Sequence, residues 1–317
     1  MTPRPPRILV IGYNALDVTV PVTGLPSVDS KCEVSGIRVG GGGPGATAAT
    51  ALATLGAAVT LVTPLTDDPG GDIQVRELSA AGVDISRCPR LAGHEIAKAV
   101  ILVDPAAETR TIFWSRGDLP CLSGDLVAPD WLDGMDLLYV DGHEPELQLA
   151  TARLAREQGL PVVMDAGSVR DGTEDLVPVC TDVLSSRIFA GQMTGQADPA
   201  SALQALQDLG PPRVGMTFGE GGVLVLTADG PRTVPAFAVP VVDTTGAGDV
   251  FHAGYAFARA RGADLPEAAA FGAAQAALKC QGWGGRGSLP TLDEVEALLA
   301  NGARRVPAPE IASYPHI

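Results

Sequence analysis

Short apolar runs alternate with longer stretches of mixed polarity along most of the chain. Residues 7–12 (RILVIG) form an apolar run with the length of a buried strand, and from residue 137 onward such runs alternate regularly with stretches of helical periodicity. This alternation favours an α/β fold with a mainly parallel sheet covered by helices on both faces. The pattern predicts strands at 7–12, 57–62, 137–140, 161–165, 182–184 and 213–217, and helices at 46–55, 71–81, 145–158, 199–209 and 266–278.

Two segments, approximately 18–39 and 94–114, do not fit such a sheet. The second consists of two period-two stretches around a turn at 104–108, which predicts a hairpin. We expect both segments to form a small β-sheet lid over an opening in the fold. The prediction is therefore one three-layer αβα domain spanning 1–317 with an inserted lid. Lid strands would present unpaired edges, and a homodimer that pairs two lids would cover them.

Composition and charge narrow the expected partners. The chain has 317 residues, a net charge of −15 and five dispersed cysteines without a CxxC pair. The acidic balance argues against nucleic acid and anionic membranes as partners, and no apolar run approaches the roughly 18 residues of a membrane-spanning helix. The cysteines are typical of reduced thiols, so we expect a cytoplasmic protein without a secretory signal. A site that handles phosphate would have to obtain its positive potential locally.

The segment 241–258 (VVDTTGAGDVFHAGYAFA) carries the densest chemistry. Residues 239–242 suggest an apolar strand end, the two consecutive threonines are natural capping residues, and a helix is expected from residue 247 onward. Amide groups at a helix start lack intrahelical partners and attract a phosphate or a developing oxyanion; here they belong to Gly246, Ala247 and Gly248. Asp249 in the first turn has two interpretations, a partner of the helix dipole or a general base for phosphoryl transfer.

The glycine-rich residues 40–45 (GGGGPG) are expected to form a loop. They match the GxGxxG pattern of dinucleotide-binding folds, but they do not close the first strand and Pro44 interrupts them. We favour a different interpretation, in which Gly42 and Gly43 let a polyhydroxy substrate reach bare backbone groups.

Several single residues are further candidates for the site, some of them with both a functional and a structural interpretation. His143 follows a predicted strand at the sheet edge where α/β folds bind ligands, so it either contacts substrate or caps a helix. Lys31 on the lid either reaches an anionic substituent of the substrate or is solvated. His252 is interpreted as a packed or capping residue, Asp165 as a phosphate or metal partner or a member of an ion pair, and Trp283 as a wall of a nucleotide pocket.

Five motifs, in order along the chain, resemble the signatures of the ribokinase-like carbohydrate kinases, the PfkB family. They are the segments 12–17, 42–47 (GGPGAT, followed by Gly56), 217–222 (TFGEGG), 243–249 (DTTGAGD) and 284–290 (GGRGSLP). The AALKC and GGRG segments are most similar to the ketohexokinase and sulfofructose-kinase-like branch. The resemblance implies an α/β fold with a β-lid and ATP-dependent transfer of the γ-phosphoryl group to a hydroxyl of a small ketose, aldose or sugar acid. Two alternatives are a nucleoside kinase of the same fold and a non-catalytic sugar or nucleotide sensor.

The resemblance also implies roles for individual positions. Asp249 would be the base that deprotonates the acceptor hydroxyl, beside an anion hole formed by Gly246, Ala247 and Gly248. Substrate would be bound by Asp17, Gly42, Gly43 and Thr47, to which the arguments above add Lys31 and His143. The nucleotide would lie against Thr217, Gly219, Gly222 and Ser186. A monovalent cation beside the anion hole would use oxygen atoms of Asp243, Thr245, Lys279, Gly282, Gly284 and Ser288.

Two departures from the family pattern affect these roles. Thr47 stands where the family usually has Asn, and residues 186–189 (SRIF) lack the acid of the NxxE motif that organises magnesium. The predicted cofactors are ATP and Mg²⁺, with K⁺ as the candidate monovalent ion. We expect Mg²⁺ to arrive with ATP and to be held mainly by phosphates and water.

Overall fold

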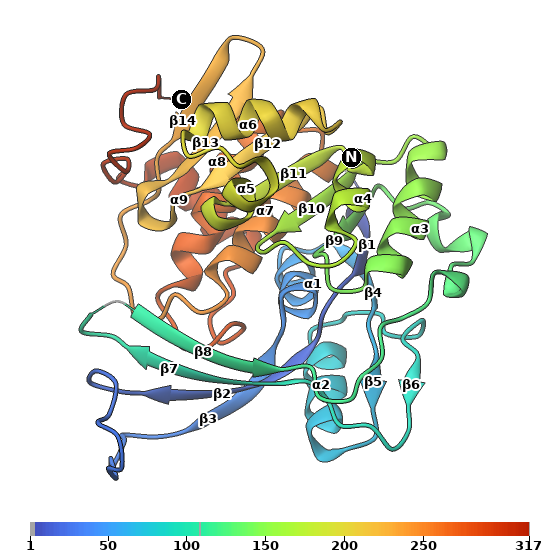
Figure 1. Cartoon of the computed structure of the whole chain (residues 1–317), viewed down its shortest axis with the longest axis vertical. Coiled ribbons are helices and arrows are strands. Elements are labelled where there is room, and N and C mark those ends of the chain that lie inside the picture. Colours follow the sequence, from blue (N-terminus) through green and yellow to red (C-terminus); the bar gives the residue numbers. More distant parts are fainter. Residues whose placement is uncertain (1–3, 108, 317) are drawn as a thin grey trace.

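An eight-stranded sheet forms the centre of the computed structural model, which describes residues 4–107 and 109–316 (Figure 1). Its six strands from β12 to β4 are parallel, and β13 and β14 continue the sheet in antiparallel orientation. This agrees with the predicted mainly parallel sheet. The spatial order is β14 (Gly230–Val234), β13 (Val223–Thr227), β12 (Arg213–Thr217), β11 (Asp182–Ser186), β10 (Val162–Ala166), β9 (Leu137–Val140), β1 (Arg7–Ile11) and β4 (Ala58–Val62).

Helices cover both faces of this sheet because its parallel strands are apolar on both sides. In β1, Ile8 and Val10 pack into one buried cluster, whereas Leu9 and Ile11 pack into the other. The first cluster is completed by α1 (Pro44–Thr54), α7 (Ala247–Ala260), α8 (Leu265–Lys279) and α9 (Leu292–Asn301). The second is completed by α3 (Pro145–Glu157), α4 (Thr173–Leu176), α5 (Arg187–Thr194) and α6 (Pro199–Asp208).

A second, four-stranded sheet extends away from the main body (Figure 1). Its inner face packs Ala99, Ile101 and Val103 against Trp283, whereas all seven residues of β8 are exposed. This sheet occupies the predicted lid segments. Its strands lie in the order β3 (Arg38–Gly42), β2 (Ala15–Pro21), β7 (Lys98–Asp104) and β8 (Thr109–Ser115). Beside it lie α2 (Pro69–Ala80) and the short pair β5 (Leu65–Thr66) and β6 (Arg90–Leu91).

The glycine-rich segment differs from the expected loop. Residues 40–42 belong to β3, Pro44 begins α1, and only Gly43, with a φ of 81°, makes the turn between them. A Cβ at Gly42 would lie 2.1 Å from the Asp17 carboxylate, so glycine is needed for β3 to pair with β2 at this position. The glycines thus bring the lid strand close to a carboxylate instead of forming an open loop.

Other boundaries also differ from the predictions. Residues 239–242 are not a strand, because the amides of Val242 and Asp243 donate to the Cys280 carbonyl in a neighbouring loop. Helices α1 and α2 begin two residues earlier than predicted, since proline is well suited to the first helical position. Several elements were not predicted from the pattern: α4, α5, α9, β5, β6, β13, β14, and the 3₁₀ turns Gly124–Leu126, Pro129–Leu132, Val177–Val179 and Gly219–Gly221.

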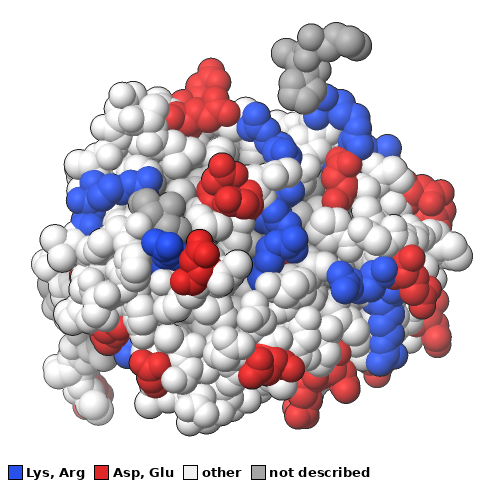
Figure 2. Space-filling model, turned by 90° about the horizontal axis from the view of Figure 1, so that it is seen from above, with Lys and Arg blue, Asp and Glu red and all other residues white. Residues whose placement is uncertain are grey.

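Charged side chains of both signs lie on the surface. Figure 2 shows acidic and basic side chains interspersed on the face that it presents, with uncharged residues between them. Among residues 4–107 and 109–316, no helix has the length and apolar character that crossing a membrane requires.

Candidate active site

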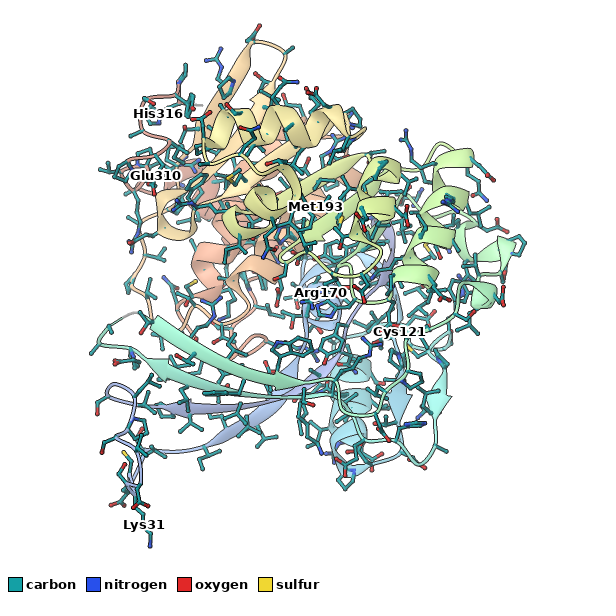
Figure 3. All side chains as sticks on the ribbon, viewed as in Figure 1. Lys31, Cys121, Arg170, Met193, Glu310 and His316 are labelled. Carbon is teal, nitrogen blue, oxygen red and sulfur yellow. The ribbon has the colours of Figure 1, made fainter. Side chains whose placement is uncertain are left out.

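The candidate site lies at the carboxyl ends of the parallel strands, facing the inner side of the lid. Asp165, Ser186 and Thr217 lie at or next to the ends of β10, β11 and β12. Arg170, in the loop after β10, has its guanidinium 5.5 Å from the ring of Trp114 on β8, and Figure 3 shows it between the sheet edge and the lid. Open α/β sheets bind ligands at this edge, and here the lid covers it.

Helix α7 begins with amide groups directed toward this space. Gly246 is its capping residue, with a φ of 74°, and a Cβ there would lie 2.8 Å from the Gly285 Cα. The first amide that bonds back within the helix is that of Val250, to the Gly246 carbonyl at 2.9 Å. The amides of Gly248 and Asp249 precede it and are available to an anion. The predicted anion-hole residues therefore do lie at a helix start.

Asp249 lies half-buried in this first turn. Burial and the nearby Asp165 carboxylate raise its pKa to about 7, while His252 and Arg110 oppose the shift. A general base is most effective when its pKa is close to the working pH. The electrostatics therefore suit a proton acceptor better than a simple partner of the helix dipole.

His252, one turn further along α7, supports this geometry. Its ring nitrogens lie 2.7 Å from the Gly248 carbonyl and 3.0 Å from the Leu184 carbonyl, and Nδ1 lies 3.3 Å from Asp165 Oδ2. The ring is buried, so these contacts hold the start of α7 against β10 and β11. This agrees with the interpretation of His252 as a packed residue and of Asp165 as its ion-pair partner.

The sugar side of the site is organised around Arg286, which the sequence reasoning did not single out. Its guanidinium donates to Thr47 Oγ1 at 3.4 Å, Asn14 Oδ1 at 3.4 Å and the Gly42 carbonyl, and only 7% of its side chain is exposed. Burial raises the pKa of Asp17 to about 6, and the Arg286 charge opposes that shift. Three of the predicted substrate residues therefore surround one arginine. The sequence feature that could have indicated Arg286 is that it is the one basic residue in the segment GGRGSLP.

Aromatic and cationic side chains lie next to these residues on the sugar side of the site. His143 stacks on Tyr13 with ring centroids 4.5 Å apart, and Trp114 meets both rings edge-on. Arg116 forms an ion pair with the buried Glu144, and Arg170 lies over Trp114. Burial lowers the pKa of His143; the Asp141 carboxylate opposes this shift, and the two nearby arginines add to it. His143 thus lies in the site as a neutral, stacked ring.

The nucleotide side is a larger cavity of about 1560 Å³. Ser186 and Thr217 line it, together with Arg187 and Arg305, which pair with Glu310 and Glu220. Ser186 also caps α5 by accepting from the Phe189 amide at 3.0 Å. Gly219 and Gly222, with φ values of 58° and 96°, shape the turn after β12. This turn brings Glu220 and Gly221 into the wall of the cavity.

The six residues expected around a monovalent cation are brought together, but one has an unexpected role. The Asp243 carboxylate accepts from the amides of Thr245 at 2.8 Å and Gly284 at 2.7 Å, and Gly282 lies against Ser288. Lys279 approaches through its side chain, whose Nζ donates to the Asp243 carbonyl at 3.0 Å. The carbonyl oxygen of Lys279 accepts from the Gly282 amide at 3.2 Å, and its contribution to a cation site stays a prediction.

Two further expectations differ from the structure. Lys31 is exposed at the free end of the segment between β2 and β3, away from the sheet edge (Figure 3). The Arg38 guanidinium lies over the Trp283 ring, 4.5 Å from the ring centroid. Trp283 also lines a cavity of about 420 Å³, together with Asp17. The structure therefore does not bring Lys31 to the site, and it places Trp283 against the lid instead of the nucleotide cavity.

Comparison with known proteins identifies the family. Residues 5–292 match the pfkB family carbohydrate kinases. The chain belongs to this family. The match confirms the predicted family and the predicted class of enzyme, a carbohydrate kinase that transfers a phosphoryl group.

Individual relatives of this pfkB kinase agree over nearly their full lengths. An ATP-dependent ribose-1-phosphate kinase from Halopiger xanaduensis is 29% identical over 297 residues, covering 93% of this chain and 98% of the relative. A ribokinase from Bacillus subtilis is 26% identical over 295 residues, covering 93% and 99%. The crystal structure of a putative ribokinase from Agrobacterium tumefaciens superposes with a TM-score of 0.85 at 28% identity, covering 93% and 98%. The predicted three-layer fold with its separate small sheet is thereby confirmed.

Proposed function

We propose that this pfkB kinase transfers the γ-phosphoryl group of ATP to a hydroxyl of a small sugar, with Asp249 as the base. The observation that carries the proposal is the start of α7, where a carboxylate with a raised pKa stands next to free backbone amides. Phosphoryl transfer requires positioning and stabilisation of charge on the transferred group. Both requirements are met at this one helix end.

Residues of this chain can carry out each step of the transfer. Asp17 and the backbone at Gly42 and Gly43 would hold the sugar with its hydroxyl toward Asp249. Asp249 accepts the hydroxyl proton while the oxygen bonds to the γ-phosphorus and the bond to ADP breaks. The negative charge on the transferred group is stabilised by the free amides of Gly248 and Asp249 at the start of α7. Arg110 adds a positive charge from the lid, where it donates to Thr244 Oγ1 at 3.0 Å.

ATP fits the large cavity beside Ser186 and Thr217. The described residues contain no cluster of three or more His, Cys, Asp or Glu side chains that would hold Mg²⁺ by themselves, and Phe189 stands where the NxxE acid is expected. The ion would therefore be held by ATP phosphates and water, and its charge would offset that of the phosphates.

For the acceptor, we propose a small sugar that carries an anionic substituent, such as a sugar 1-phosphate. Arg170 supports this choice, because it is half-buried at the sheet edge and no carboxylate of the described residues forms an ion pair with it. Arg116 and His143 lie near it, and a guanidinium can bind a phosphate through two parallel hydrogen bonds. The name of the Halopiger relative points to the same chemistry. The finer expectation of a position nearest to ketohexokinases and sulfofructose kinases stays a prediction, since the relatives described above have ribokinase-type names.

Release of ADP over a panel of sugars tests both parts. The panel contains ribose, ribose 1-phosphate, fructose, a sugar acid and a nucleoside, the last because a Methanothermobacter thermautotrophicus relative is a nucleoside kinase. We expect the phosphorylated sugar to have the highest kcat/KM, and Arg170→Ala to raise its KM by about tenfold with little change for free ribose. Arg153→Ala, at an exposed position of α3, is the matched control. ADP release from none of these sugars would contradict the kinase, and a preference for neutral sugars would contradict the anionic acceptor.

The predicted homodimer also remains a proposal. It is supported by the outer face of the lid, where Val39, Val100 and Phe113 are 53%, 41% and 59% exposed. Light scattering should give twice the chain mass, and Phe113→Asp should give a monomer; a monomeric wild type would contradict it. A cytoplasmic location likewise stays a prediction, supported by five free cysteines.

A further inference from the structure

A fully buried lysine lies directly behind the proposed anion hole. Lys279 is the last residue of α8, and its side chain is 0% exposed. Of the described residues, only Asp243 receives a hydrogen bond from its Nζ, through the backbone carbonyl at 3.0 Å. Burying a lysine side chain is unfavourable and uncommon unless the charge has a partner or a role. The position of Lys279 therefore calls for an explanation.

The surroundings of Nζ are two loops that meet at Asp243. One loop leads from Asp243 to Gly246 and into α7, and the other runs from Cys280 to Ser288. Asp243 joins them, since its amide donates to the Cys280 carbonyl at 3.2 Å and its carboxylate accepts from the Gly284 amide at 2.7 Å. Burial lowers the pKa of Lys279, whereas the charges of Asp243 and Asp249 favour its protonated form. The hydrogen bond from Nζ to the Asp243 carbonyl places this basic group behind the helix start that would receive the phosphoryl group.

This is also the place where the family resemblance implies a monovalent cation. The oxygen atoms expected to bind K⁺ include the Asp243 carbonyl, which here already accepts from Nζ. A lysine ammonium is a compact point charge, like K⁺, and two such charges repel strongly when they share one buried site. The residues present therefore do not fit a resident K⁺ ion at this position.

We propose that the Lys279 ammonium is a built-in substitute for the monovalent cation, so that this kinase works without K⁺. As a positioning residue, Lys279 holds the Asp243 carbonyl and keeps the loop before α7 in the conformation that directs its amides at the γ-phosphoryl group. A covalently attached charge is present in every molecule and needs no binding equilibrium with the solvent. The inference rests on the proposed anion hole, because a cation in this place matters only if phosphate is handled there.

The first test compares the wild-type kinase in potassium chloride and in tetramethylammonium chloride at equal ionic strength. We expect kcat to agree within about twofold, because a charge fixed to the chain replaces the exchangeable ion. A saturable increase of tenfold or more with K⁺ would overturn the proposal. This comparison needs no variant, so a substitution that fails to fold cannot obscure it.

The second test uses Lys279→Ala, which leaves room for an ion, and Lys279→Met, which fills the space without charge. We expect both to lose roughly 10²-fold in kcat without K⁺. K⁺ should then restore much of the activity to the alanine variant and little to the methionine variant. A merely structural lysine would give two variants that are equally indifferent to K⁺, and that result would contradict the proposal. Lys98→Ala, at an exposed lid position, is the matched control.

Diffraction from crystals soaked in Tl⁺, an anomalous scatterer that substitutes for K⁺, separates this inference from the kinase assignment. We expect no Tl⁺ beside the Asp243 carbonyl in the wild type and a Tl⁺ ion there in Lys279→Ala. A Tl⁺ ion at that carbonyl in the wild type would overturn the inference. Because this measurement does not depend on turnover, it remains decisive even if the sugar panel shows no activity.

Discussion

The two ends of helix α7 differ in the hydrogen-bond and charge partners that surround a carboxylate. At its start, Asp249 has a pKa raised to about 7, and the amides around it are free to bind an anion. At its other end, Tyr255 and Arg259 donate to the Asp182 carboxylate at 2.6 Å and 2.9 Å, and Arg213 adds an ion pair at 3.4 Å. Asp182 begins β11, so this second cluster lies at the amino edge of the sheet, opposite the candidate site.

The difference shows how one helix can serve both stability and reactivity. A buried carboxylate that accepts from three donors has hydrogen-bond and charge partners within the fold and serves to hold the surrounding elements together. A buried carboxylate that faces another carboxylate, as Asp249 faces Asp165, is destabilised in its ionised form and gains by accepting a proton. We therefore expect substitutions at the two ends to affect different measurements.

The largest effect is expected at the start of the helix. Asp249→Asn should lower kcat by roughly 10²-fold or more, because the amide cannot accept the hydroxyl proton. The midpoint of thermal unfolding should not fall, since the substitution removes a charge that burial disfavours. The matched control is Glu267→Gln, which changes the acid at the equivalent first-turn position of α8. Unchanged turnover in Asp249→Asn would reject its role as base.

At the other end, Asp182→Asn should lower the free energy of unfolding by about 3 kcal/mol, because it leaves Arg259 buried without its charge partner. The kcat of the enzyme that remains folded should stay close to that of the wild type. Urea denaturation measures the first quantity. As a control, Glu296→Gln breaks the exposed pair with Arg261 and should change stability by less than about 1 kcal/mol. A large loss of kcat in Asp182→Asn would mean that the two ends are not independent.

A smaller effect is expected from the lid. Arg110→Ala removes the hydrogen bond to Thr244 and a positive charge near Asp249, and should lower kcat by about tenfold. The side chain is exposed, so the unfolding midpoint should hardly change. Steady-state kinetics at saturating ATP checks this, with Lys98→Ala as the control on the outer side of the lid. Equal losses in the two variants would assign the effect to the lid in general.

The smallest effect is the pH dependence near neutrality. Since the pKa of Asp249 is raised to about 7, the base is largely protonated below that pH, and kcat/KM should rise about twofold between pH 7 and pH 8. The raised pKa also means that the folded state prefers the protonated form. The stability contribution is therefore present at low pH and is lost as the pH rises through about 7. Asp249→Asn should remove both dependences. A rate profile that is flat from pH 6 to pH 8 in the wild type would contradict the pKa shift.

The sequence was sufficient to predict those features of the structure that depend on the residues of one short segment. The apolar run of β1 predicted a strand buried on both faces, and DTTGAGD predicted a helix start with small residues and an acid. These features depend on backbone geometry over a few residues, which is local. The predicted loop at 40–45 failed because the requirement for glycine came from Asp17 on a neighbouring strand, and no local pattern reveals such a contact.

Only the tertiary structure determined which charged side chains lie near the site, because these side chains come from distant segments of the chain. In the sequence, Arg286 is one cation in a glycine-rich stretch and Lys279 is an ordinary basic residue at the end of a helix. Folding places Arg286 among Asn14, Gly42 and Thr47, and it places the Lys279 ammonium on the Asp243 carbonyl. The free energy of a buried charge depends on every group around it, whatever its position along the chain. The residues proposed to carry the reaction could thus be predicted from the sequence, whereas the position of the Lys279 side chain depends on the packing of two loops.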